Sequence, residues 1–201
     1  MLRILVRIIP KIMFLKFNHQ PKLPLALPLA LPRFVTKTMT VSGYDFVLRR
    51  ATIADIDTLV RIEEAVYAGV APWVLRDFLS ELSRPHIRLY LVIERHQQVI
   101  GFAGVAYQRD QRDMHITNIA VVPIWQSHGL GTTILSEIHQ FATAVGVATM
   151  TLEARASNHG AIALYQRLGF EQTGIKKGYY FGDHEDAVSM VKQLENSTSN
   201  N

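Results

Sequence analysis

The amino-acid sequence predicts an α/β (α+β) domain in which a mixed central sheet of about seven strands is flanked by four helices. Runs rich in β-forming residues alternate along the chain with segments in which apolar residues recur at helical spacing. Two neighbouring β runs are joined by a short polar link, which indicates an antiparallel hairpin. No internal repeat is visible, and 201 residues suffice for one domain plus an appendage. The expected element order is β-α-α-β-β-β-α-β-α-β-β.

The first strand and the first two helices are expected in the N-terminal half of the domain. Alternating apolar residues predict a strand over 45–50. Thr52 and Asp55 then have the spacing of a capping box, and the apolar residues that follow recur at helical spacing, so a helix is predicted over 53–67. A second helix is predicted over 73–82, after a break at glycine and proline.

The other elements follow from the same patterns. The hairpin is predicted over 88–94 and 99–107. The remaining elements are a strand over 115–122, a helix over 129–145, a strand over 147–154, a helix over 158–168 and two strands over 170–180 and 187–194.

Residues 1–38 differ from the rest of the chain in composition. They hold seven Lys or Arg residues and no acid, so the remainder carries 14 basic against 17 acidic residues. The basicity therefore belongs to this segment, and direct nucleic-acid binding by the folded domain is not expected. Residues 21–32 have a proline every three or four positions, which indicates extended, polyproline-like chain.

Residues 1–38 have three interpretations. A signal peptide is disfavoured because the charges are spread through the apolar stretch. A basic membrane-surface helix over 1–17 is the second, although no apolar run approaches the roughly 20 residues of a membrane span, and we expect no membrane association. We favour the third, in which translation begins at Met39 or Met13. The expected parts of the chain are then a disordered or artefactual extension (1–38), the domain (45–195) and a disordered tail (196–201).

The segment from Ile119 to Gly131 carries the clearest functional signal. A strand ends at a proline, and a short loop then delivers two glycines to the start of a helix. Backbone N–H groups at a helix N-terminus are unpaired and partly positive, so they can hold a pyrophosphate, and glycine lets the backbone come close. A dinucleotide fingerprint would need a third glycine where the chain has Ile134, and a Walker loop would need a lysine where it has Thr132.

The pattern Gln126-x-x-Gly-x-Gly131 after a strand resembles the acetyl-CoA pyrophosphate loop of the GNAT superfamily of N-acetyltransferases. The residues from Leu152 to Asn158 and from Ala161 to Phe170 resemble the superfamily's next strand and helix. Within it, the closest resemblance is to the RimI-type ribosomal-protein alanine N-acetyltransferases. The supporting motifs follow one another in the expected order: Ile62-Glu63, Pro72-Trp73, Asn118-Ile-Ala-Val121, Leu152-Glu-x-Arg155, Tyr179-Tyr180 and His184-Glu-Asp-Ala187.

The resemblance implies the GNAT fold, acetyl-CoA as cosubstrate and no metal. It makes Glu153 the general base and Tyr165 the general acid. The implied acetyl-CoA contacts are the backbone of Ile119, Ala120 and Val121 for the pantetheine arm, Gln126, Ser127, His128, Gly129, Leu130 and Gly131 for the pyrophosphate, and Asn158. The superfamily usually has Arg or Lys within the loop. Ser127 and His128 therefore predict weaker cofactor binding, since histidine is only partly charged near pH 7.

The two catalytic assignments suit the chemistry of amine acetylation. An α-amine has a pKa near 7.7–8.0 and must lose a proton before it attacks a thioester. A carboxylate such as Glu153 can take that proton, and a phenol such as Tyr165 can protonate the departing thiolate. The absence of cysteine fits direct transfer without a cysteine acyl-enzyme. The alternatives are that Glu153 is solvated or pairs with Arg155, and that Tyr165 packs its ring in the core.

Aromatic residues supply the candidates for substrate binding. Trp73 is either core or a wall of the substrate entrance. Tyr179 and Tyr180 either frame the peptide site, as the resemblance implies, or pack in the sheet. His115 and His139 have no metal-ligand spacing, so we expect neither to be functional.

The resemblance implies a cytoplasmic N-α-acetyltransferase that uses acetyl-CoA to modify the N-terminal amine of a protein such as a ribosomal protein, with alanine as the first residue. The first alternative is acetylation of a small amine (a polyamine, an aminoglycoside or an amino acid), which would favour an enclosed acidic pocket. The second is a non-catalytic acyl-CoA-binding module. The presence of both Glu153 and Tyr165 argues against that module.

Overall fold

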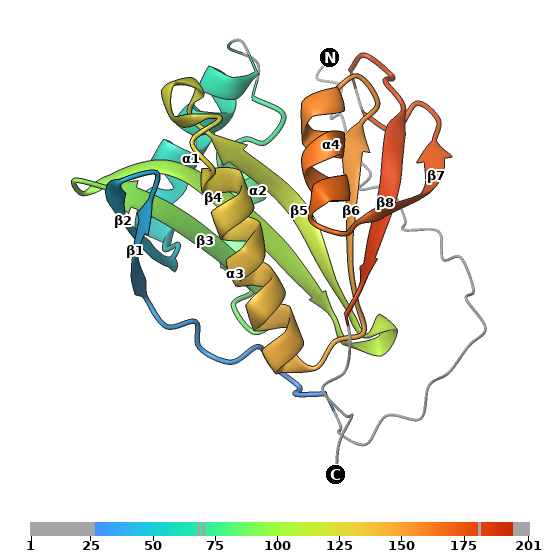
Figure 1. The fold of residues 1–201 in the computed structure, drawn as a ribbon, viewed down its shortest axis with the longest axis horizontal. Helices are drawn as coiled ribbons and strands as arrows, with labels where there is room; N and C mark the ends of the chain where they lie inside the picture. The colour runs from blue at the N-terminus through green and yellow to red at the C-terminus, as the bar shows by residue number, and fades with distance from the viewer. Residues whose placement is uncertain (1–26, 68, 70, 181, 195–201) are drawn as a thin grey trace, which may run out of the picture.

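The computed structural model describes residues 27–67, 69, 71–180 and 182–194, which form one mixed sheet of eight strands (Figure 1). The strand order is β1-β2-β3-β4-β5-β6-β8-β7, and only β5 and β6 pair in parallel. The strands are β1 (Lys37–Val41), β2 (Tyr44–Arg50), β3 (Arg88–Arg95), β4 (Gln98–Gln108), β5 (Asp113–Val121), β6 (Thr149–Arg155), β7 (Glu171–Lys176) and β8 (Ala187–Gln193).

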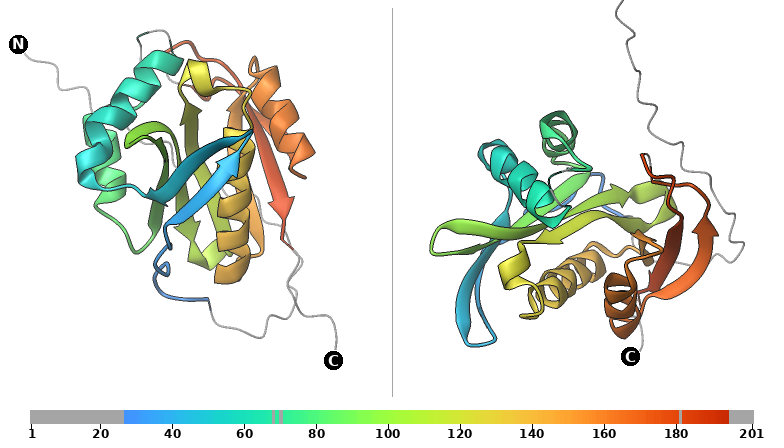
Figure 2. Two further views of the ribbon diagram at one scale, coloured as in Figure 1. Left: turned by 60° about the vertical axis from the view of Figure 1, so that its left-hand side comes forward. Right: turned by 90° about the horizontal axis from the view of Figure 1, so that it is seen from above.

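Two helices cover each face of the sheet (Figure 2). α1 (Ile56–Val66) and α2 (Leu75–Leu82) lie on one face, and α3 (Leu130–Val145) and α4 (His159–Arg167) lie on the other. In α1, the buried residues recur at intervals of three and four, so one stripe of the helix faces the sheet; they are Ile56, Leu59, Ile62 and Glu63. Within the described residues, the helices are too short or too polar to cross a membrane.

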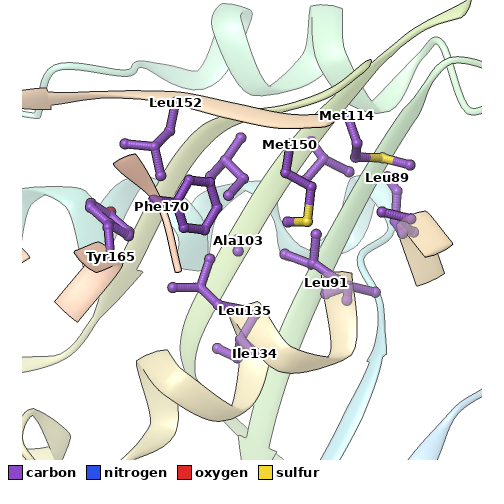
Figure 3. Packing of buried hydrophobic residues seen from close by; sticks show 14 of the residues in the cluster. Leu89, Leu91, Ala103, Met114, Ile134, Leu135, Met150, Leu152, Tyr165 and Phe170 are labelled. Atoms are coloured by element: carbon purple, nitrogen blue, oxygen red, sulfur yellow. The ribbon is translucent and has the colours of Figure 1, made fainter. Parts of the chain in front are cut away.

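The larger hydrophobic core lies between the sheet and the face covered by α3 and α4. Met150 and Leu152 of β6 belong to it, together with Leu135 of α3 (Figure 3). Because successive residues of a strand point to opposite faces, Thr151 and Glu153 project from the other side of β6, on the face that α1 and α2 partly cover. The alternation of one strand thus separates the core from the polar side chains described below.

β5 and β6 are paired over only part of their length. Their ladder runs from Asp113 opposite Thr149 to Ile116 opposite Leu152, and beyond it the two strands diverge (Figure 1). At the same place a β-bulge in the pairing of β4 with β5 leaves Thr117 outside the register. A bulge bends its strand and increases the local twist, which accounts for the divergence. The sheet is therefore open between the C-terminal ends of β5 and β6.

Gly104 of β4 lets the bulge form. The ring of Tyr90 lies across this position, and a Cβ there would be 2.3 Å from the ring and 2.6 Å from Asn118 Oδ1. The Tyr90 hydroxyl reaches Oγ1 of Thr117 at 3.2 Å, so a side chain from β3 contacts the bulged residue across β4. Glycine at 104 is required by this close approach.

The expected element order is confirmed, with one strand, β1, added before it. One predicted boundary needs correction. The strand predicted over 170–180 ends at Lys176, because the chain turns at Gly178, which has a φ of 58°. Tyr179 and Tyr180 therefore lie in a turn after β7 and not in the sheet.

Residues 27–36, which the sequence placed in a disordered or artefactual extension, pack against the domain. Leu27, Leu31 and Phe34 are buried in the larger core. The Tyr107 hydroxyl donates a hydrogen bond to the carbonyl of Pro28 at 2.8 Å. The N-terminal boundary of the folded part therefore lies before residue 45, while residues 1–26 and 195–201 fall outside the described residues.

Candidate active site

Glu153 lies on β6 next to the place where β5 and β6 separate, and both of its carboxylate oxygens contact basic groups. Oε1 accepts a hydrogen bond from Nζ of Lys176 at 2.7 Å. Oε2 lies 3.3 Å from Nε2 of His115 on β5. The Glu153 side chain is 11% exposed, so it is largely shielded but still open to a substrate. His115, which the sequence presented as isolated, is thus part of this site.

Hydrogen bonds continue from His115 into the sheet. Nδ1 of His115 lies 2.9 Å from Oγ1 of Thr151, whose hydroxyl donates to Oδ2 of Asp113 at 2.6 Å. The Thr149 hydroxyl donates to Oδ1 of Asp113 at 2.7 Å. Asp113 is buried, and burial raises its pKa above the ordinary range, opposed by the two threonine hydrogen bonds and by His115. A buried acid therefore stands at the far end of a polar chain that begins at Glu153.

Tyr179 and Tyr180 lie beside Glu153. Their rings meet edge to face with centroids 5.2 Å apart. Nζ of Lys176 lies 5.2 Å from the centroid of the Tyr179 ring, and the Arg155 guanidinium carbon lies 4.2 Å from that of Tyr180. Burial raises the pKa of Tyr179 to about 12 and that of Tyr180 well above its usual value. Both phenols therefore stay protonated at neutral pH, and their rings form an aromatic wall next to Glu153.

Arg155 forms ion pairs with acids other than Glu153. Its Nη1 lies 2.6 Å from Oδ2 of Asp183 and 2.6 Å from Oε2 of Glu185. Within the described residues, Glu153 therefore does not form the ion pair with Arg155 that the sequence offered as an alternative.

Tyr165 of α4 is 6% exposed and packs against Phe170, with the ring centroids 5.9 Å apart. Burial raises the pKa of Tyr165 to about 12, and nearby Tyr67 adds to the shift. The hydroxyl therefore keeps its proton at neutral pH. Tyr67 also contributes to the raised pKa of Tyr180, so it lies in the neighbourhood of both tyrosines. The ring of Tyr165 thus packs in the core, as one interpretation of the sequence expected, while its hydroxyl still carries the proton that a general acid needs.

Glu63 of α1 is a second acid, and it lies near Tyr67. It is 2% exposed, and its Oε2 finds no hydrogen-bond partner among the described residues. Burial raises the pKa of Glu63 to about 7, and the backbone of Trp73 and the side chain of Asn118 oppose the shift. Nδ2 of Asn118 is itself buried and close enough to Glu63 to favour its charged form, but it makes no well-aligned hydrogen bond among the described residues. Trp73 packs against Phe78, with centroids 5.6 Å apart, so its half-buried ring lies against the smaller core and keeps one part exposed.

The loop from Gln126 to Gly131 presents backbone donors at the N-terminus of α3. In the described part of the chain, the N–H groups of residues 127–132 donate no hydrogen bond, and the first one into the helix runs from Thr133 N–H to Gly129 O at 2.9 Å. Ser127 and Gly129 are left-handed, with φ of 62° and 84°. Consecutive free N–H groups at a helix start suit an anionic group.

Two loop side chains are held by the protein itself. Nε2 of Gln126 donates to the Val121 carbonyl at 2.9 Å, which pairs the last carbonyl of β5. Nδ1 of His128 lies 2.8 Å from the Gln126 carbonyl, and its ring packs edge to face on Trp125 with centroids 5.2 Å apart. The loop therefore offers an anion its backbone, because the Gln126 side chain points back to β5.

The other predicted acetyl-CoA contacts have different surroundings. Ile119 and Ala120 lie on β5 beyond its ladder with β6. Leu130 is buried in the larger core, so its side chain serves packing. Asn158 caps α4: its Oδ1 accepts a hydrogen bond from Ala161 N–H at 3.1 Å. This capping role explains why an asparagine occupies position 158, and no contact with a ligand is needed to explain it.

Gly129 and Gly131 indicate whether the loop fits a phosphate group. The φ of 84° explains glycine at 129. Nothing in the fold explains glycine at 131, because a Cβ there would meet only Leu164 at 3.6 Å, an ordinary contact. A glycine beside free N–H groups, together with the part of β5 beyond the β6 ladder, fits the pyrophosphate and pantetheine arm of acetyl-CoA. Within the described residues, no group of three His, Asp or Glu is arranged to hold a metal.

Sequence reasoning missed several residues of this site, among them Glu63, Tyr67, His115 and Lys176. Glu63 carried a signal, because it falls on the apolar stripe of α1, where an acid is unexpected. His115 carried none, since its partners Thr151 and Glu153 come from a strand far along the chain.

Known proteins are similar to this chain in sequence and fold. The model of the acetyltransferase (GNAT) family matches residues 56–170. The [ribosomal protein bS18]-alanine N-acetyltransferase of Escherichia coli K12 is 34% identical over 139 residues, which are 68% of this chain and 90% of that one. N-alpha-acetyltransferase RimI of Mycobacterium tuberculosis is 29% identical over 154 residues, which are 76% and 95% of the two chains.

A solved structure agrees with the sequence relatives. The crystal structure of the ribosomal-protein-S18-alanine N-acetyltransferase from Escherichia coli has a TM-score of 0.67 to this chain at 29% identity, over 78% of this chain and 99% of that one. The family match covers more than half of the chain and includes the loop before α3, Glu153 and Tyr165. This chain belongs to the GNAT family of acetyltransferases and is an N-acetyltransferase.

Proposed function

We propose that this chain transfers an acetyl group from acetyl-CoA to the N-terminal amine of a protein with a small first residue such as alanine, and that the substrate is a ribosomal protein. The relatives named for this activity support the substrate class. The observation that carries the proposal is the position of Glu153, a shielded carboxylate where β5 and β6 separate and beside the aromatic wall of Tyr179 and Tyr180. A cytoplasmic location belongs to the same proposal.

Backbone groups of the chain hold the donor. The free N–H groups of residues 127–132 bind the pyrophosphate, and the backbone of Ile119 to Val121 binds the pantetheine arm, where the Val121 carbonyl is already paired with Gln126. When bound, acetyl-CoA supplies the acetyl group as an activated thioester.

Glu153 and Tyr165 move the protons. Glu153 removes a proton from the substrate ammonium, and a positioned base of this kind contributes about 10²–10⁴-fold to the rate. Tyr165, whose pKa is about 12, retains its proton at neutral pH and delivers it to the departing sulfur, and the second proton that the nitrogen loses after attack restores the phenol. The buried ring fixes the direction of the hydroxyl, since packing leaves a core aromatic side chain few alternatives.

A thiol-release assay on the full chain tests this proposal. It compares an Ala-starting basic peptide, the same peptide with a blocked N-terminus, and spermidine. We expect turnover of the free peptide alone and at least a tenfold loss in Glu153→Gln and in Tyr165→Phe, a conservative threshold given the about 10²–10⁴-fold contribution of a positioned acid or base. Glu171→Gln, an exposed acid on β7, is the matched control and should keep full activity.

Other results would change the assignment. Preference for spermidine would make the chain a small-amine acetyltransferase. Tight CoA binding without turnover of any amine would favour the acyl-CoA-binding module. Full activity of Glu153→Gln would remove Glu153 from the chemistry.

A further inference from the structure

The hydrogen bonds around His115 define where its protons lie. The Thr151 hydroxyl has one proton, which it donates to Asp113 at 2.6 Å, so towards His115 it can only accept. Nδ1 of His115, 2.9 Å from Thr151 Oγ1, therefore carries a proton. Nε2 faces Oε2 of Glu153 at 3.3 Å. If neither Nε2 of His115 nor Oε2 of Glu153 carried a proton, their lone pairs would repel each other at this distance. One proton is therefore shared between these two atoms.

We propose that Glu153, His115, Thr151 and Asp113 form a proton relay, in which His115 is a positioning and relay residue that acts through Glu153. This inference rests on the proposed role of Glu153 as the base. His115 holds the Glu153 carboxylate from one side while Lys176 holds it from the other. The relay then carries the proton that Glu153 takes from the substrate away from the reacting amine.

The proton balance of the relay is closed. The substrate ammonium gives one proton to Glu153, and the shared proton moves fully to Nε2 of His115. The Nδ1 proton passes to Thr151 Oγ1, and the Thr151 proton passes to Oδ2 of Asp113. The net change is one proton lost by the amine and one gained by Asp113. When the product leaves, the proton returns along the same path and reaches solvent at Glu153, which matches the one proton released per ammonium acetylated.

The surroundings of His115 suit this role. Asp113 of β5 and Glu153 of β6 face the imidazole with negative charge, and Lys176 of β7 balances Glu153. Tyr179 and Tyr180 near Glu153 stay protonated at neutral pH. Burial raises the pKa of Asp113, which makes it a better proton acceptor than an exposed aspartate.

Two threonines of β6 provide a matched test. Thr151 and Thr149 both donate to Asp113, at 2.6 and 2.7 Å, but only Thr151 also contacts His115. kcat/KM for the Ala-starting peptide would be measured at pH 7 and pH 9 for Thr151→Val, Thr149→Val and His115→Gln. The glutamine keeps an N–H towards Glu153 but cannot pass a proton on.

At pH 7 we expect kcat/KM to fall at least about tenfold in Thr151→Val and in His115→Gln. In Thr149→Val, kcat/KM should stay within about twofold of the value for the unmodified protein. At pH 9 the deficit should shrink to about twofold, because an α-amine of pKa near 7.7–8.0 then arrives neutral and releases no proton. A merely structural role would give the same deficit at both pH values.

Equal effects of the two threonine changes, or a deficit independent of pH, would overturn the relay. Glu153→Gln is measured alongside: if it is inactive while His115→Gln behaves as the unmodified protein, the relay fails and the proposed base stands. If Glu153→Gln is fully active, the proposed base itself fails. A measurement on the unmodified protein tests the proposal even if the variants do not fold. ¹⁵N NMR of the imidazole at pH 7 should show Nδ1 of His115 protonated, and an unprotonated Nδ1 would refute the proposal.

Discussion

Gly129 and Gly131 lie two residues apart at the start of α3, yet the protein constrains them differently. Gly129 needs a left-handed φ of 84°, whereas a Cβ at Gly131 would meet only Leu164 at 3.6 Å. We expect Gly129→Ala to lower the free energy of unfolding by about 1–2 kcal/mol. Gly131→Ala should leave it unchanged or raised, since alanine suits a helix better, and should increase KM for acetyl-CoA at least about fivefold (~1 kcal/mol).

Thermal unfolding and the thiol-release assay measure the two quantities separately. An unchanged KM in Gly131→Ala would mean that the loop does not approach the donor as proposed.

At the same scale, the sequence located Glu153 and Tyr165 but not their surroundings. A sequence motif identifies a residue by the residues next to it in the chain, and Glu153 lies within such a motif. Its partners His115 and Lys176 lie 38 and 23 positions away; they reach it only because β5 pairs with β6 and β7 lies one strand further on, across β8. Contacts across strands depend on register, which local patterns do not specify.

At the scale of elements, periodicity predicted the four helices and seven of the eight strands, because each buries a regular stripe or face. β1 was missed because its burial alternates only between half-buried and exposed residues, which leaves no strong apolar pattern. The segment 27–36 was missed for another reason. Its prolines correctly argue against helix and sheet, but Leu27, Leu31 and Phe34 are still buried without regular structure.

The packing of segment 27–36 predicts that it stabilises the domain. Phe34 is 6% exposed and packs against Phe141 of α3, with the ring centroids 6.0 Å apart. Phe34→Ala should cost about 3 kcal/mol, the lower end for a buried phenylalanine, and lower Tm by roughly 6–12 °C for a chain of this size. Val35, its neighbour, is 71% exposed, so Val35→Ala is the control and should leave Tm nearly unchanged. Equal melting of both variants would show that the segment adds no stability.

At the scale of the whole molecule, the divergence of β5 and β6 organises the site. The bulge at Thr117 opens the sheet at one end, while the ladder from Asp113 to Ile116 holds it together at the other. α1 and α4 lie on opposite faces of the sheet (Figure 2), and Tyr67 after α1 is near enough to Tyr165 of α4 to raise its pKa. The sequence could predict a mixed sheet but not this opening, because the bulge depends on the contact of Tyr90 with Gly104 across two strands.

Keeping Glu63 buried near this opening should make the stability of the whole domain depend on pH. Its pKa rises from 4.5 in the unfolded chain to about 7 in the fold because burial disfavours the charged form. Below pH 4.5 both states are protonated and nothing is lost. As pH rises through 4.5 to 7, the unfolded state gives up its proton first, so stability falls, by roughly 3 kcal/mol once pH exceeds 7.

Glu63→Gln removes this titration while keeping the shape of the side chain. The variant and the unmodified protein should unfold at similar temperatures at pH 4.5, and the variant should be several degrees more stable at pH 8. Glu64→Gln, an exposed neighbour on α1, should show no such divergence. Parallel melting curves for Glu63→Gln and the unmodified protein from pH 4.5 to 8 would mean that Glu63 finds a compensating partner in solution, and that the burial of its charge costs the fold nothing.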